Sequence, residues 1–243
     1  MFIILNFIYM TRLTDKIINE IYKANADFNL WNRSSKLLLG VSGGKDSLAL
    51  FRLLEIMKIK FEAVHVRLGK EFDISFIEKN NISCNVLETN IYDKVSRKKK
   101  NICFSCSRKR RKRLLEYAQK HNFNQVIFAH HKNDVVETYF LNQIFSRETS
   151  TMLPKQIIFD GLFQILRPLF YVDEMDLLRF TKEQGLIISK NPCKNEGKTK
   201  RSYIKKLLRN INDLHAKIDV IDNVFNSIFN VNYKFLPRKL EDK

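Results

Sequence analysis

Hydrophobic residues in this chain fall into two patterns, short continuous runs and longer stretches with a helical period. The short runs predict buried strands, because a strand that is covered on both faces is apolar at most positions. Such runs lie at 37–40, 61–68, 82–87 and 125–129. The stretches between them place apolar residues three or four positions apart, which favours helices. Strands that alternate with helices in this way predict a mostly parallel sheet.

The second half of the chain adds a hairpin and several helices to this pattern. Two apolar runs within 157–166 flank Asp160-Gly161, a pair that is typical of tight hairpin turns. The segment 92–101 has no apolar period, and we expect an irregular basic loop there. Helices are predicted at 11–24, 45–57, 72–79, 107–122, 133–145, 173–184, 200–209 and 212–229.

These elements predict one α/β fold with a single, mostly parallel, Rossmann-like sheet and added terminal helices. A chain of 243 residues is long enough for such a fold with a substantial core. We expect a helical extension at 1–30, the main domain at 31–212, and a helix with a basic tail at 213–243. The apolar segment 1–10 is too short to span a bilayer, and Met10 is an alternative translation start. The protein is therefore expected to be soluble and cytoplasmic, with no membrane partner.

The segment 42–47, Ser-Gly-Gly-Lys-Asp-Ser, joins the first predicted strand to the following helix. A strand that turns through glycines into a helix directs backbone N–H groups at one point, which predicts an anion site. The segment is not a Walker phosphate loop, because Asp46 stands where that loop needs a hydroxyl residue. His65, near the end of the second strand, borders the same edge of the sheet, although a packed strand histidine is the alternative interpretation.

The charge of the chain is strongly unbalanced. Lys and Arg number 43 against 26 Asp and Glu, which gives a net charge of +17 and indicates a polyanionic partner. A lysine-rich composition explains part of this excess. It does not explain the segment 94–113, which contains eleven Lys or Arg and no acidic residue. The clustering favours a nucleic-acid contact over a merely solvated face.

Three of the four cysteines are candidate metal ligands. Cys103 and Cys106 form a Cys-x-x-Cys pair at the start of a helix and among cations, two features that lower the pKa of a thiol. Cys193 lies in a separate Asn-Pro-Cys loop, whereas Cys84 falls within a strand pattern and is expected in the core. A Cys-x-x-Cys pair alone is compatible with zinc, iron–sulfur or redox use. Three ligands leave one metal position open, as a reactive centre requires.

Several of these patterns together resemble a known family. The segment 42–47 is similar to the loop of the N-type ATP pyrophosphatases, the PP-loop enzymes. The chain also has Cys-x-x-Cys-Ser-Arg-x-Arg-Arg at 103–111, His-His-x-x-Asp-x-x-Glu-Thr at 130–138, Arg-Pro-Leu at 167–169, and the late Cys193. This combination resembles the tRNA 2-thiocytidine synthetases over most of the chain.

The resemblance implies an ATP-dependent tRNA sulfurtransferase. ATP would adenylate C2 of a tRNA pyrimidine, with the cytidine at tRNA position 32 preferred, and pyrophosphate would leave. Sulfur would then displace AMP. The implied cofactors are ATP, Mg²⁺ and a [4Fe–4S] cluster on Cys103, Cys106 and Cys193. The implied partners are tRNA, a cysteine desulfurase or free sulfide as sulfur donor, and a second copy of the chain in a homodimer.

The resemblance also implies roles for individual residues. Lys45 would neutralise pyrophosphate, and Asp46 would face the magnesium ion. The implied catalytic residues are Lys45, Asp46, Arg110 and Asp134. The implied ATP-binding residues are Ser42, Gly43, Gly44, Lys45, Asp46, Ser47, His65 and His130. The implied tRNA-binding residues are Arg97, Lys98, Lys99, Lys100, Arg108, Lys109 and Arg111.

Other functions within and outside the superfamily compete with this interpretation. Asn133 stands where the family usually has an acidic residue, which leaves magnesium binding there open. A uridine 2-thiolase is the leading alternative, but such enzymes commonly add zinc-ribbon cysteine pairs, which this sequence does not contain. A lysidine-forming synthetase is a further alternative, but it would carry a larger C-terminal domain than this chain has. A non-catalytic iron–sulfur or metal-dependent RNA-binding module is the alternative from another class. The intact Lys45, Asp46 and Ser47 favour an enzyme.

Overall fold

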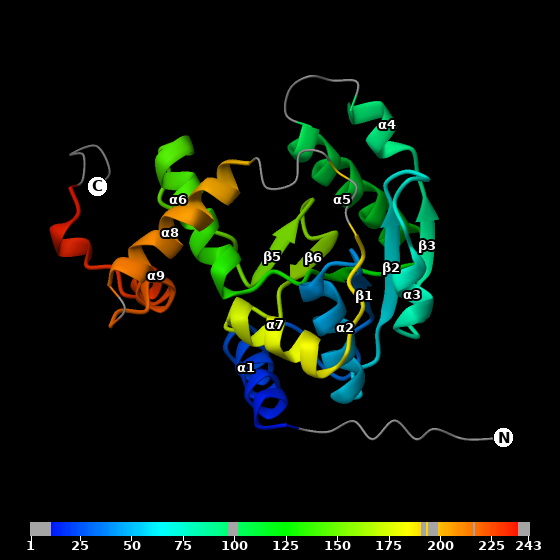
Figure 1. Ribbon diagram of the computed structural model, residues 1–243, viewed down its shortest axis with the longest axis horizontal. Coiled ribbons are helices and arrows are strands. Elements are labelled where there is room, and N and C mark those ends of the chain that lie inside the picture. The colour runs from blue at the N-terminus through cyan, green and yellow to red at the C-terminus, as the bar shows by residue number, and fades with distance from the viewer. Residues whose placement is uncertain (1–10, 97–101, 191–192, 194–198, 216, 238–243) are drawn as a thin grey trace.

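A computed structural model describes residues 11–96, 102–190, 193, 199–215 and 217–237 (Figure 1). Its centre is a six-stranded sheet in the order β3-β2-β1-β4-β6-β5. Neighbouring strands are parallel, except that β5 pairs antiparallel with β6. This confirms the mostly parallel α/β sheet and the hairpin. The strands are β1 (Leu37–Gly40), β2 (Glu62–Arg67), β3 (Asn85–Glu88), β4 (Gln125–Ile127), β5 (Lys155–Ile158) and β6 (Phe163–Leu166).

Helices connect the strands and cover both faces of the sheet (Figure 1). They are α1 (Arg12–Phe28), α2 (Lys45–Ile56), α3 (Ser75–Lys79), α4 (Ile91–Ser96), α5 (Ile102–Lys120), α6 (Lys132–Ser146), α7 (Glu174–Glu183), α8 (Lys200–Leu214) and α9 (Val220–Phe229), followed by the 3-10 turn η1 (Tyr233–Phe235).

Two helices differ from the sequence prediction because of hydrophobic packing. Helix α1 continues to Phe28, because this ring packs against Phe170 with 5.4 Å between the ring centroids. Helix α4 occupies the start of the segment that was expected to be an irregular loop. Ile91 and Val95 are buried in the core beneath it, so this part of the prediction was wrong. The rest of that segment, 97–101, lies outside the described residues.

Further boundaries were wrong for local reasons. Helix α3 begins only at Ser75, because the Asp73 side chain accepts a hydrogen bond from the Ser75 N–H at 2.9 Å. Cys84 precedes β3 instead of lying within it, although it packs against the core as expected. Helix α5 begins at Ile102, earlier than expected, so both cysteines of the pair lie inside it. The last helix begins after Asp219, whose carboxylate caps it.

The two faces of the sheet carry separate hydrophobic cores. In β1, Leu37 and Leu39 belong to the core shared with α1, α2, α3 and α7, whereas Leu38 belongs to the core shared with α4 and α5. Successive side chains of a strand point to opposite faces, so β1 is buried on both. This burial explains its continuous run of leucines.

A third core joins the C-terminal helices to the sheet domain. Val135 of α6, Ile204 of α8 and Phe225 of α9 are buried together around Phe170. Figure 1 shows these three helices grouped at one end of the molecule. In the described ranges, none of the helices has the length and apolar character that crossing a membrane requires.

Candidate active site

The loop between β1 and α2 is closed by its two serines. Ser47 Oγ donates to the carbonyl of Gly44 at 2.9 Å and accepts from the N–H of Ser42 at 3.1 Å. Gly44 precedes the first turn of α2 and provides no side-chain cap, so the N–H groups of that turn point out of the helix. The loop therefore has the geometry of an anion site.

Gly43 has a backbone conformation that glycine adopts far more readily than other residues, with φ +84°. A Cβ here would lie 2.8 Å from Cβ of Ser189 and 2.9 Å from Cε1 of Phe76. The Ser189 N–H donates to the Gly43 carbonyl at 2.9 Å. Asn80 holds the same segment through both backbone groups of Ile187, each at 2.8 Å. The chain that leaves α7 thus lies directly on the loop.

Lys45 is held between two carboxylates. Its Nζ lies 2.6 Å from Asp46 Oδ1 and 3.0 Å from Glu174 Oε1 at the start of α7. The same Glu174 oxygen accepts from Lys205 at 2.5 Å. Burial opposes ionisation of Glu174, but the hydrogen bond from Lys205 and the charge of Lys45 outweigh it and lower its pKa to about 2. Glu174 is therefore ionised at neutral pH.

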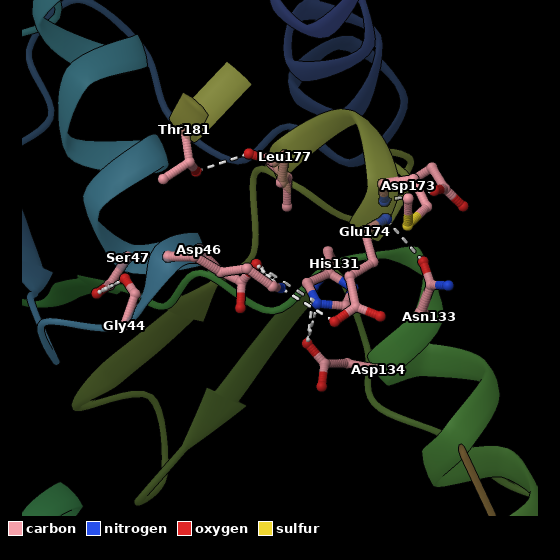
Figure 2. A network of polar contacts seen from close by, with 12 residues as sticks. Gly44, Asp46, Ser47, His131, Asn133, Asp134, Asp173, Glu174, Leu177 and Thr181 are labelled. Atoms are coloured by element: carbon pink, nitrogen blue, oxygen red, sulfur yellow. Dashed lines mark hydrogen bonds and ion pairs between the residues drawn. The ribbon is translucent and has the colours of Figure 1, made fainter. Parts of the chain in front are cut away.

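Asp46 also faces His131 at the start of α6, as Figure 2 shows. His131 Nε2 lies 3.8 Å from Asp46 Oδ1 and 3.4 Å from Asp134 Oδ2. Arg201 of α8 donates to Asp134 Oδ1 at 2.7 Å and to Thr138 Oγ1 at 3.0 Å. Burial opposes ionisation of Asp134, but the charges of His131 and its neighbours hold its pKa below the usual range. Two carboxylates, Asp46 and Asp134, thus converge from different helices.

Two histidines place buried nitrogen atoms beside the loop. Burial lowers the pKa of His130 to about 4, so its imidazole is neutral at physiological pH. Its Nδ1 meets no hydrogen-bond partner within the described part of the chain. His65 Nδ1 lies 2.8 Å from the carbonyl of Val41, which leaves its buried Nε2 without a partner among the described residues. These nitrogens are suited to receive a hydrogen bond from a ligand or to donate one.

A cavity of about 280 Å³ lies beyond the carboxyl ends of β1, β2 and β4. Residues of the loop and residues of α5 both line it. Gly44 of the loop lines it, and the polar residues that line it are Ser42, Asp46, Ser47, Ser107, Arg110, Arg111, His130, Asp134 and Arg201. A second hollow of about 420 Å³ is also lined by the loop, together with His65 and Lys45. Both hollows lie where the parallel sheet was expected to bind a ligand.

The three candidate ligand cysteines lie in one region but are not arranged around a metal. Cys103 is exposed, while Cys106 and Cys193 are half-buried. Cys193 and Cys103 both act on the pKa of Cys106, which places the three thiols near one another. Within the described ranges, no three His, Cys, Asp or Glu side chains are grouped closely enough to hold a metal ion. The three thiols fit, in the kind of donor that they provide, an iron–sulfur centre bound by thiolates.

The pKa of Cys106 differs from the sequence expectation. Burial raises it, and the nearby charges of Arg110 and Lys109 only partly offset this effect. The expectation that both cysteines have lowered pKa values was therefore wrong for Cys106. Its side chain packs against the core shared with α4 and α5, and this burial could not be inferred from the pattern of cations.

The cations of α5 divide between two faces. Arg110 and Arg111 line the cavity, and Arg111 also lies 5.7 Å from the centre of the Phe128 ring. Arg108 is exposed and Lys109 is half-exposed on the neighbouring surface. The other predicted tRNA-binding residues lie outside the described residues; they are Arg97, Lys98, Lys99 and Lys100.

Sequence reasoning missed four residues that complete the site. Glu174 belongs to the helix predicted at 173–184, and His131 belongs to the motif at 130–138, but the sequence assigns neither a role in the site. Arg201 and Lys205 lie on α8, far along the chain from the carboxylates that they contact. Arg201 and Lys205 are four positions apart, which places them on one face of α8. This spacing was the one feature of the sequence that could have indicated their shared role.

Comparisons with known proteins agree with this geometry. A family model described as a PP-loop domain matches residues 11–211. The tRNA-cytidine(32) 2-sulfurtransferase 2 of Francisella tularensis subsp. tularensis (strain FSC 198) is 31% identical over 250 residues, covering 96% of this chain and 97% of the relative. The corresponding enzyme 1 of Francisella philomiragia is 31% identical over 252 residues, covering 97% and 96%.

A solved structure shows the same fold. The U34-tRNA thiolase NcsA from Methanococcus maripaludis, determined with its [4Fe-4S] cluster, is similar with a TM-score of 0.68. The match covers 90% of this chain and 80% of that chain at 20% identity, so it shows the fold alone. The sequence relatives are closer, and the chain belongs to the PP-loop family and, within it, to the family of the tRNA-cytidine(32) 2-sulfurtransferases.

Proposed function

We propose that this protein is an ATP-dependent tRNA sulfurtransferase that replaces the C2 oxygen of a cytidine at tRNA position 32 by sulfur. One observation supports this most directly: the Ser42–Ser47 loop and the cysteine-bearing helix α5 line a single cavity. A nucleotide held by the loop would therefore lie against the helix that carries Cys103 and Cys106. The relatives that are 31% identical over nearly their whole length carry this activity in their names.

The first step activates the C2 oxygen. ATP would bind with its phosphates on the N–H groups of the loop, and Asp46 would hold the Mg²⁺ ion that accompanies them. The C2 oxygen attacks the α-phosphorus, the bond between the α-phosphorus and the bridging oxygen breaks, and pyrophosphate leaves. Lys45 and Arg110 stabilise the charge that develops on pyrophosphate. Asp134 stands opposite Asp46 across His131 and provides a second carboxylate for the metal–nucleotide complex.

The second step replaces the activated oxygen. A sulfur nucleophile bonds to C2, and the C2–oxygen bond breaks so that AMP leaves with the original oxygen. AMP is a good leaving group, whereas the oxygen of an unmodified base is a poor one. Cys103, Cys106 and Cys193 would hold a [4Fe–4S] cluster, which when bound supplies an iron without a protein ligand as a soft site for sulfur.

The chemistry of the site supports nucleotide binding before any metal is added. His130 is neutral and has a buried nitrogen without a described partner, and the α2 N-terminus has no side-chain cap. A cysteine desulfurase or free sulfide as donor, a homodimer and a cytoplasmic location stay predictions. Sedimentation of the purified protein, alone and with tRNA, tests the homodimer.

The test of this function is thiolation of defined RNA. The protein is purified and reconstituted without oxygen, and then incubated with ATP, Mg²⁺, sulfide and an unmodified tRNA transcript. Mass spectrometry of the digested nucleosides should find 2-thiocytidine, and pyrophosphate should appear only when tRNA is present. Asp46→Ala should abolish both products while leaving iron and sulfide content unchanged. Formation of 2-thiouridine instead would overturn the choice of base, and the absence of any thionucleoside would overturn the function.

A further inference from the structure

A groove of about 700 Å³ runs between α5 and the tip of the β5–β6 hairpin. On α5, Phe104, Arg108 and Lys112 follow one another at four-residue spacing and so share one face of the helix. The hairpin contributes Phe159 and Leu162. This groove is distinct from the cavity at the Ser42–Ser47 loop, and its described lining includes none of the predicted ATP-binding residues.

Two aromatic rings in this groove are unusually exposed. Phe104 is 68% exposed and Phe159 is 65% exposed, so both leave most of a large apolar surface in water. Phe159 is positioned by its edge contact with the Phe163 ring at 6.3 Å between centroids. Both rings therefore present surface to a molecule in the groove.

The hairpin holds Phe159 at some conformational cost. Phe159 and Asp160 both have φ +52°, and Gly161 has φ +94°. A bulky aromatic residue is uncommon in this left-handed region. Strained residues of this kind gather at ligand-binding sites. The turn thus keeps the Phe159 ring outside the core. Phe159 would be less strained if its φ were negative.

The rim of the groove is positively charged. Arg108 and Lys109 make no ion pair with any described residue. Glu116 is the one acidic residue in the described lining, and Lys112 and Arg113 engage it at 3.8 Å and 2.7 Å. Exposed aromatic rings with flanking cations form the usual surface for single-stranded nucleic acid, because rings stack on bases and cations bind phosphates.

The groove connects with the proposed active site through Arg111. This residue lines both the groove and the cavity at the loop. A nucleotide in the groove would therefore be a close neighbour of a base in the cavity. Because the groove and the cavity share the Arg111 side chain, they could bind consecutive nucleotides of one RNA strand.

We propose that this groove binds an unpaired nucleotide of the tRNA loop next to the target base. Its base stacks on Phe159 or Phe104, and its phosphate lies on Arg108 and Lys109. The inference rests on the proposed function and deepens it, because it assigns a recognition surface for the RNA strand outside the ATP cavity.

The test measures binding of an unmodified anticodon stem–loop RNA to the full chain by fluorescence anisotropy at several salt concentrations. Phe159→Ala and Phe104→Ala should each weaken binding about five- to one-hundredfold, without changing the dependence on salt. Arg108→Ala should instead reduce the slope of log affinity against log salt by about one. Phe159→Trp keeps a stacking surface and should retain binding, which separates stacking from a folding defect.

A matched control variant and a second measurement distinguish a failure of the groove proposal from a failure of the proposed function. Phe235 is 77% exposed and lies beside Lys234 in η1, outside the groove, so Phe235→Ala should bind RNA like the wild type. ATP binding should be unchanged in all the phenylalanine variants. Wild-type affinity in Phe159→Ala and Phe104→Ala, with thiolation intact, would overturn the groove but not the function. Failure of the wild-type protein to bind RNA or thiolate it would overturn the function itself.

Discussion

The site keeps Lys45 charged, and it balances that charge with two carboxylates until a phosphate binds. Burial alone would lower the pKa of Lys45, but Asp46 and Glu174 outweigh burial and raise it, so the ammonium group is charged at every physiological pH. Glu174 is in turn kept ionised by Lys205. A lysine held in this way has few rotamers left to lose when the ligand arrives, which favours binding.

The charge of Glu174 should be visible in the dependence of stability on pH. Its pKa falls from 4.5 in the unfolded chain to about 2 in the folded one. The stability that it adds is therefore complete above about pH 4.5 and is lost as the pH falls through about 2. At pH 7, Glu174→Gln should lower the free energy of unfolding by about 2 kcal/mol, since it leaves two lysines without this carboxylate.

Denaturant unfolding at pH 7, 5 and 3 measures this effect. The difference between wild type and Glu174→Gln should shrink toward the most acidic condition. Glu78 is exposed and pairs with no cation in the described ranges, so Glu78→Gln should change stability little at any pH. An equal loss for Glu174→Gln at pH 7 and pH 3 would contradict the ionic origin.

The cysteines provide a second prediction at this scale. If Cys193 is a cluster ligand, Cys193→Ala should lose thiolation and the visible absorption of the cluster but retain ATP binding. Cys84 is half-buried against the core, and burial raises its pKa to about 11, which disfavours the thiolate that iron requires. Cys84→Ala should therefore keep both iron and activity. Iron content at the wild-type level in Cys193→Ala would contradict the three-cysteine site.

At the scale of elements, the β1–α2 loop depends on the segment that follows α7. The Ser189 N–H binds the Gly43 carbonyl, and Asn80 anchors the segment from the other side through Ile187. The loop and the segment 187–189 are thus packed together. Small changes at the loop should consequently affect the position of the late cysteine as well as the phosphates.

Replacement of Gly43 tests this packing. Gly43→Ala places a Cβ within 3.0 Å of both Ser189 and Phe76 at φ +84°, and it should destabilise the protein by about 1–3 kcal/mol. Gly44→Ala is the matched control. Its Cβ would meet only Ser42 Oγ at 3.4 Å, and its φ of −78° suits alanine. Thermal unfolding of both variants distinguishes them, and an equal shift in Tm would contradict the close approach at Gly43.

At the scale of the whole molecule, the C-terminal helices complete the site from a distance. Helix α8 supplies Arg201 to Asp134 and Lys205 to Glu174. It is held in place by the third core around Phe225 and Phe170. The stability of that core and the electrostatics of the site are therefore coupled.

A substitution that leaves a cavity in the third core tests whether the stability of this core affects the site. Phe225 is 3% exposed, and Phe225→Ala should lower the free energy of unfolding by about 3–5 kcal/mol. It should also reduce pyrophosphate release, because α8 loses its support. Phe229 lies in the same helix but is 55% exposed, so Phe229→Ala should have a much smaller effect on both quantities. Full activity in a folded Phe225→Ala protein would show that α8 does not need this core.

The parallel sheet, the β1–α2 loop and the resemblance to the family all follow from the amino-acid sequence. Each of these depends on local patterns: apolar runs set strands, glycines set the turn, and six consecutive residues carry the loop chemistry. Local residues also indicated the hairpin, through Asp160-Gly161, and the cap of α7, through Asp173. The division into 1–30, 31–212 and 213–243 stays a prediction.

Which distant charges meet, and which thiols are buried, depends instead on the packing of the folded chain. Arg201 pairs with Asp134 across 67 positions of sequence, and no local pattern encodes such a contact. The pKa of Cys106 rises because packing removes its thiol from water, whereas the sequence showed only the neighbouring cations. Electrostatic effects depend on distance and on local solvent, and both are properties of the folded chain.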